Sequence, residues 1–142
     1  MEKYYTIEPE VAGGWGENTV AATTPGGTTV VRKFHYQFDG WLGDELLTST
    51  PCYIVTERLS NEIRNNNLTG VEFDNVEITV SGEFTDLYND RQLPRFVWLK
   101  IIGKPKEDDF GMTPDILLVV SERALRLLRL FGISHAEIDE AI

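Results

Sequence analysis

The stretch Val55-Thr56-Glu57-Arg58 returns, in conservative form, as Val120-Ser121-Glu122-Arg123, 65 positions further along the chain. The same shift, without a gap, aligns three further pairs of segments: Ile63-Arg64 with Leu128-Arg129, Leu68-Thr69 with Ile133-Ser134, and Glu72-Phe73-Asp74 with Glu137-Ile138-Asp139. Each copy reads as an apolar strand, a hydroxyl residue, Glu-Arg, a helix, a helix stop and a second strand. The repeat therefore predicts two similar strand–helix–strand units, at about residues 52–78 and 117–142.

Helix signals agree between the two copies. Thr56 and Ser121 are good N-cap residues, because a side-chain hydroxyl accepts a hydrogen bond from a free amide of the first turn. Asn67 and Gly132 align at the expected helix stops, and these two residue types tolerate the left-handed backbone conformation best. We predict one α+β domain over residues 1–142, with a mixed or mainly antiparallel sheet, two short helices and six to eight strands.

Two origins fit the repeat, a true duplication or a chance likeness between two common supersecondary units. Helix ends have few chemical solutions, so unrelated units share caps and stops. Chance does not readily explain Arg64 and Arg129, or the shared Glu-x-Asp, at one fixed offset. The pattern favours duplication.

The composition favours some partners over others. The 142 residues include 13 basic and 23 acidic side chains, for a net charge of −10. A nucleic acid would be repelled by this charge, so no direct nucleic-acid contact is expected, whereas a basic protein would be attracted. The single cysteine, Cys52, excludes an internal disulfide and fits a buried apolar position. No apolar run approaches the length of a membrane span, and no export signal is visible, so we expect a cytoplasmic protein without membrane contact.

Acidic residues in three predicted loops are the candidate partner-binding residues. They are Asp39, Asp44 and Glu45 around Trp41, then Asp86 and Asp90, then Glu107, Asp108 and Asp109. Acidic side chains around an exposed aromatic residue would suit a basic partner, although Trp41 packed in the core is an equally good interpretation. Three consecutive acidic residues would need a special loop to hold a cation. A third possibility is a reaction centre assembled from Asp86, Asp90 and Asp109.

Other ionisable residues give weaker signals. The Glu57-Arg58 and Glu122-Arg123 pairs suit either an anion site or, as we favour, the first turn of a helix. Arg123, Arg126 and Arg129 are predicted to pair with the protein's own carboxylates. His35 and His135 are far apart, with no cysteine or serine partner at a known spacing, so we predict no metal site and no cofactor.

The repeat also resembles a known signature. Ile54-Val55-Thr56-Glu57-Arg58, followed by Ile63 and by Leu68-Thr69-Gly70-Val71-Glu72-Phe73, is similar to the signature of immunity proteins in bacterial polymorphic toxin systems. The type it resembles is the eleventh immunity family, formerly a domain of unknown function, and Leu118 to Arg123 resembles the same signature. The family pattern often places Pro after the last aromatic residue, where this chain has Asp74.

The resemblance implies a small cytoplasmic antidote that binds and blocks one cognate toxin domain and carries no catalytic residues. An acidic chain without a catalytic motif agrees, because it suits occlusion of a basic toxin surface. We therefore predict a non-catalytic immunity protein of bacterial competition. Two alternatives stay open: a hydrolase that reverses a toxin-made modification, and a small ligand-binding or scaffold domain. The sequence predicts no oligomeric state.

Overall fold

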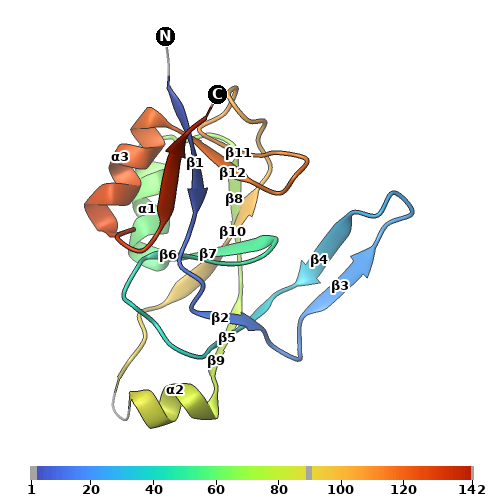
Figure 1. The fold of residues 1–142 in the computed structure, drawn as a ribbon, viewed down its shortest axis with the longest axis vertical. Helices are drawn as coiled ribbons and strands as arrows, with labels where there is room; N and C mark the ends of the chain where they lie inside the picture. Colours follow the sequence, from blue (N-terminus) through green and yellow to red (C-terminus); the bar gives the residue numbers. More distant parts are fainter. Residues whose placement is uncertain (1–2, 89–90, 142) are drawn as a thin grey trace.

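A computed structural model describes residues 3–88 and 91–141 of the chain. These residues form one small α+β domain with thirteen strands and three helices, which confirms the predicted fold class (Figure 1). Its centre consists of two four-stranded antiparallel sheets with matching strand orders. The first sheet runs β6 (Leu46–Ser49), β7 (Cys52–Thr56), β10 (Phe96–Ile101), β8 (Val71–Asp74). The second runs β11 (Phe110–Met112), β12 (Leu118–Ser121), β1 (Tyr4–Glu8), β13 (Glu137–Glu140).

Strand pairing is the same in both sheets, residue for residue. Thr56 pairs with Phe96 and Ser121 pairs with Tyr4, so β1 is the counterpart of β10 at a shift of 92 positions. The same shift for β1, together with the 65-position shift of the repeat, also matches the other edge of each sheet. There the pair Asp74–Trp98 of the first sheet corresponds to the pair Asp139–Thr6 of the second. β10 follows β8 in the chain, whereas β1 precedes every other element of its sheet. The two units are therefore alike in space but differ in chain order.

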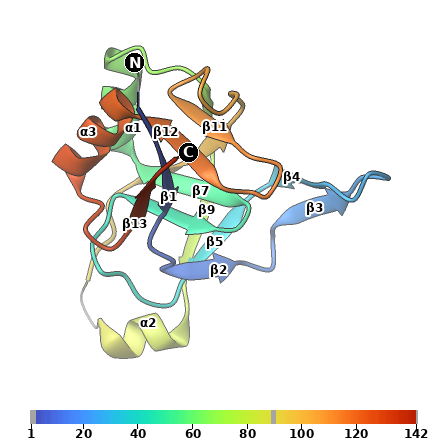
Figure 2. The same cartoon turned by 45° about the horizontal axis from the view of Figure 1, so that its top comes forward.

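Each unit carries one helix, placed where the sequence predicts it. α1 (Glu57–Asn65) begins after Thr56, whose hydroxyl accepts from the Leu59 amide, and α3 (Glu122–Phe131) begins after Ser121 in the same way. Asn67 and Gly132 follow the helices with positive φ, as their alignment predicts. The helices lie side by side and pack against each other (Figures 1 and 2). One apolar core joins both helices and both sheets through residues such as Leu59, Ile63, Leu99, Leu118, Val120, Leu125 and Leu128.

A second, aromatic core covers the other face of the first sheet. All five residues of β7 are buried, because Tyr53 and Val55 face the helices while Cys52 and Ile54 face this second core. A strand covered on both faces reads as a continuous apolar run. The covering sheet runs β2 (Gly13–Trp15), β5 (His35–Phe38), β9 (Glu77–Val80), with β5 and β9 parallel. The aromatic rings packed in this second core include Phe34, Tyr36, Phe38, Phe84, Phe96 and Trp98.

The hairpin of β3 (Val20–Thr23) and β4 (Thr29–Lys33) projects from the body as a two-stranded arm (Figures 1 and 2). Nearly all of its residues are exposed. No helix within residues 3–88 and 91–141 is long and apolar enough to cross a membrane.

Several details differ from the sequence predictions. Residues 3–88 and 91–141 contain thirteen strands rather than six to eight, because all but one of them are only three to five residues long. Residues 82–94, predicted as a polar loop, begin with a third helix, α2 (Gly82–Leu87), which the Ser81 hydroxyl caps and Phe84 anchors in the aromatic core. The run of β-branched and aromatic residues from Thr28 to Phe38 divides at Phe34 into β4 and β5, since its first half belongs to the arm. Gly13 to Trp15 pair with β5 as strand β2, because Gly13 has no Cβ and lets the chain pass close to the Gln37 main chain.

Candidate functional site

Three of the predicted partner-binding residues lie inside the protein. Asp44 is 2% exposed, and Glu45 and Asp109 are each 6% exposed. A carboxylate is buried only with partners that replace its water, and all three have them. The prediction that these residues form a contact surface is therefore wrong. Their acidic character suggested exposure, but it serves interactions within the domain.

Glu45 and Asp109 make the same set of contacts in the two units. The hydroxyls of Thr56 and Ser121 donate to them, at 2.6 Å in each case. The Nε atoms of Arg58 and Arg123 donate at 2.7 and 2.8 Å to the same carboxylate oxygens, and each Nη2 binds the second oxygen. The N-cap hydroxyl and the helix arginine thus hold one buried carboxylate. Two parallel bonds make the guanidinium a specific partner.

Glu45, Asp109 and their arginine partners also connect one unit to the other. The Glu45 amide donates to the Gly132 carbonyl oxygen at 2.9 Å, and the Thr69 amide donates to Asp109 at 2.8 Å. Arg58 lies over the Phe131 ring of α3, while the Nη2 of Arg123 donates to the Asn67 carbonyl beyond α1. The arginines of the repeated Glu-Arg pairs therefore bind the protein's own carboxylates. This agrees with the predicted internal pairing of Arg123, and it leaves neither arginine as a site for an external anion.

The Asp109 contacts predict a loss of stability in acid. Burial alone would raise the pKa of this carboxyl, but hydrogen bonds from Arg123, Ser121 and Thr69 outweigh it and lower the pKa from 3.8 to about 2. The unfolded chain then takes up this proton more readily, so the contribution is complete above about pH 4 and disappears as the pH falls to 2. We expect it to amount to about 2 kcal/mol. Urea unfolding at stepped pH measures the loss, and Asp109→Asn should flatten that part of the profile; an unchanged slope would contradict the assignment.

The remaining predicted residues do not converge on one site. Asp39 is exposed, and Asp86 lies exposed on α2. Trp41 is half-buried, packs edge-on against Phe96 and donates its indole N–H to the Asp44 carbonyl.

The acidic loop before β11 gives no site of its own. Glu107 is exposed, and the half-buried Asp108 accepts from the Lys104 amide at 2.9 Å. Asp90 lies outside the described residues. Asp86 on α2 and Asp109 before β11 lie near opposite ends of the molecule (Figure 1), so these two cannot share a reaction centre.

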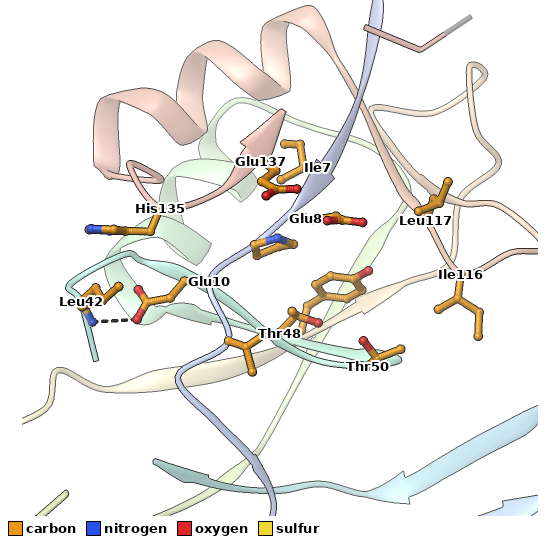
Figure 3. Close-up of a pocket in the computed structure, with 13 residues that line it drawn as sticks. Ile7, Glu8, Glu10, Leu42, Thr48, Thr50, Ile116, Leu117, His135 and Glu137 are labelled. Atoms are coloured by element: carbon orange, nitrogen blue, oxygen red, sulfur yellow. Dashed lines mark hydrogen bonds between the residues drawn. The ribbon is translucent and has the colours of Figure 1, made fainter. Parts of the chain in front are cut away.

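A different acidic feature, here named the acidic pocket, lies where β1, the α3–β13 connection and the loop before β6 meet. Its volume is about 510 Å³. Glu8, Glu10 and Glu137 line it together with His135 (Figure 3). The pocket is thus built from four parts of the chain, within residues 7–11, 42–53, 116–117 and 135–137, and their separation in the sequence hides it from motif analysis.

Glu8 and Glu137 stand directly opposite each other on β1 and β13 and both face the pocket. Like charges in such a position destabilise a sheet. The negative potential also acts on Tyr53 in the pocket wall, whose pKa is raised to about 12 by burial, with smaller contributions from Cys52 and Glu8. A cation would therefore be stabilised in the pocket between Glu8 and Glu137.

Glu10, Asp44 and His135 form a cluster at one end of the acidic pocket. The Glu10 carboxylate accepts from the amides of Leu42 and Asp44, at 2.7 and 3.2 Å. The Asp44 carboxylate accepts from the His135 amide at 2.8 Å and lies 3.1 Å from Nδ1 of the same residue. Glu10 and Asp44 are buried, whereas the His135 side chain is 43% exposed.

Apolar side chains surround the charged groups of the pocket. Val11, Leu42, Ile116 and Leu117 all line it, with exposed fractions of 38% or more. Large apolar side chains gathered at a surface mark sites of contact with other proteins. An acidic centre with an apolar rim is well matched to a lysine or arginine, which combines an aliphatic stem with a charged end.

A larger groove, of about 910 Å³, lies between the arm and the body. Among the described residues, Lys100 is the one charged side chain that lines it, beside mainly apolar side chains such as Trp98, Ile101 and Met112. This groove lacks the ionisable groups that chemistry or charge recognition needs. The acidic pocket is therefore the stronger candidate site.

Comparison with known proteins adds no family to this picture. No protein-family model matches the chain, and no curated protein matches it.

Proposed function

We propose that this protein is a non-catalytic immunity protein, which binds a cognate toxin domain in the cytoplasm and blocks it sterically. The acidic pocket is the centre of the contact surface, and a lysine or arginine of the toxin enters it. The observation that carries this proposal is the opposed pair Glu8 and Glu137 inside an apolar rim.

Charge supports a basic partner. The whole chain carries a net charge of −10, which steers a basic protein toward it and speeds encounter. At the pocket, a lysine or arginine would relieve the repulsion between Glu8 and Glu137, while its stem would cover Ile116 and Leu117. Buried apolar anchors beside a satisfied charge are typical of the residues that dominate binding energy.

The family resemblance points in the same direction. Its signature residues have structural roles here: Thr56 and Ser121 cap helices, and Arg58 and Arg123 hold buried carboxylates. The signature therefore reports the scaffold and names no binding residues. A contact surface must therefore consist of other residues, and none of these four signature residues lines the acidic pocket.

The proposal predicts that removing the charges of Glu8 and Glu137 weakens toxin binding without lowering the stability of the protein. In Glu8→Gln/Glu137→Gln the repulsion across β1 and β13 disappears, so stability should stay equal or rise slightly. Affinity for the polypeptide encoded by the adjacent upstream gene should fall about 10-fold or more, because a charged partner loses its counter-charge. Calorimetric titration of the co-purified pair measures this, and survival of cells that express the toxin gives the biological result.

The matched control is Glu83→Gln/Asp86→Asn on α2, which removes the same charge from exposed positions outside the pocket. Its affinity should change less than about 3-fold, through long-range steering alone. Equal losses in both double variants would show that only net charge matters. A parent protein that neither associates with the toxin nor protects cells would end the proposed function itself.

A further inference from the structure

Glu10, Asp44 and His135 have the composition of a metal site. One ligand atom can be chosen from each residue so that the three lie within 4.8 Å of one another. We propose that this cluster binds a divalent transition metal of the zinc class. The inference is independent of the toxin, since it concerns the isolated protein.

The electrostatics of the cluster call for a cation. Glu10 and Asp44 are 6% and 2% exposed, and their carboxylates lie side by side. Elsewhere in the domain the buried carboxylates Glu45 and Asp109 each have an arginine. Within residues 3–88 and 91–141, Glu10 has no salt bridge, and Asp44 has only His135, which is charged only when protonated. Burying carboxylates without a cation is costly, and a divalent ion bound there would neutralise both of them at once.

The ligand types select the metal. Zinc is bound by imidazole nitrogen and carboxylate oxygen at about 2.0–2.2 Å, and its sites often keep a position for water beside three protein ligands. Calcium and magnesium prefer oxygen ligands alone, so His135 argues against both. Because His135 is the exposed member, its ring can turn toward the two carboxylates, whose positions are fixed.

Backbone groups orient the two carboxylates, as the outer shell of a metal site does. The amides of Leu42 and Asp44 hold Glu10, and the His135 amide holds Asp44. These bonds leave each carboxylate oxygen with a further lone pair. The arrangement therefore offers oriented ligands, of the kind that raise metal affinity.

The corresponding junction, at the matching end of the first unit, shows that the scaffold needs neither Glu10 nor His135. At the shifts that match the two units, the counterparts of Glu10, Asp44 and His135 are Ile102, Asp108 and Gly70. There the amides of Ile102 and Gly103 donate to the Gly70 carbonyl oxygen, at 2.8 and 3.0 Å, and close the junction through backbone bonds. One junction is closed by backbone bonds and has the single carboxylate of Asp108, whereas the other gathers two carboxylates and a histidine. A structural role alone does not account for the difference.

Titration of the full-length protein with ZnCl₂, followed by calorimetry and by thermal unfolding, tests the proposal. We expect one zinc per chain and a higher unfolding temperature with zinc, with no comparable effect of MgCl₂ or CaCl₂. His135→Ala should weaken zinc binding at least 10-fold and remove the thermal shift, and because its side chain is exposed this variant should fold. Glu10→Gln should act likewise, with circular dichroism as the check on its folding.

Glu137→Gln is the matched control, since Glu137 is an exposed carboxylate of the same pocket that lies outside the cluster, and its zinc affinity should stay within about 3-fold. No zinc binding, or zinc binding that His135→Ala leaves intact, would overturn the site. Equal binding of magnesium or calcium would overturn the zinc class. None of these results depends on the toxin, so the site and the proposed function fail separately.

Discussion

Replacing either buried carboxylate that binds a helix arginine should destabilise the protein: we expect Asp109→Ala and Glu45→Ala each to lower the free energy of unfolding by about 2 to 4 kcal/mol. Asp109 accepts hydrogen bonds from Ser121, Thr69 and the Arg123 guanidinium. Its removal leaves the buried Ser121 hydroxyl without its acceptor, which costs about 1–3 kcal/mol, and it also removes the charge-assisted bonds of the half-exposed Arg123. Because Glu45 has the same N-cap and arginine partners, the two losses should be similar. Urea denaturation measures both.

Two comparisons make this result specific. Asp108→Ala, the neighbouring half-exposed acidic residue, should cost about 1 kcal/mol or less. In the double variant Asp109→Ala/Arg123→Ala the losses should not add, since both changes remove the same interaction. Additive losses, or an Asp109→Ala effect no larger than that of Asp108→Ala, would mean that the buried pair does not join the two units.

The sequence predicts the parts of this fold that depend on local chemistry. Thr56 and Ser121 signal their helices because an N-cap needs a side-chain acceptor, and Asn67 and Gly132 mark the stops because the backbone there turns left-handed. The third helix was missed because α2 is only six residues long, and its anchor in the aromatic core is tertiary. The matching roles of β1 and β10 cannot be seen in a simple repeat, since the two strands occupy different places in chain order.

The site is harder to predict than the helices, because its contacts are tertiary and leave no local pattern in the sequence. Acidic residues are usually exposed, so Asp44, Glu45 and Asp109 were assigned to the surface, although their partners lie 11 to 91 positions away. Glu45 and Asp109 also align at a shift of 64 rather than 65, and they differ in residue type. The cluster of Glu10, Asp44 and His135 has no local spacing at all. Only the folded chain brings these groups together.

A large steric effect, together with backbone strain, should come from Gly70→Ala, in the junction that corresponds to the acidic cluster. Gly70 has a φ of +93°, and an added Cβ would lie 2.1 Å from the Phe110 carbonyl oxygen and 2.9 Å from the Asp108 Cβ. The first obstacle is main chain, which cannot rotate away as a side chain does. Left-handed strain of about 1–3 kcal/mol then adds to an overpacking cost of similar size. We expect a total loss of about 3 to 5 kcal/mol in urea unfolding.

Gly43→Ala separates the two contributions to this loss. Gly43 has a similar φ of +107°, but an added Cβ there would meet no atom within 4 Å, so only the backbone strain applies and we expect a loss of about 1–2 kcal/mol. Equal losses at the two positions would mean that the Gly70 junction is loosely packed. A much larger loss at Gly70 would mean that this junction is closed by tight main-chain packing. Of the two matching junctions, the one formed by Glu10, Asp44 and His135 beside the acidic pocket would then be the one with room for a ligand.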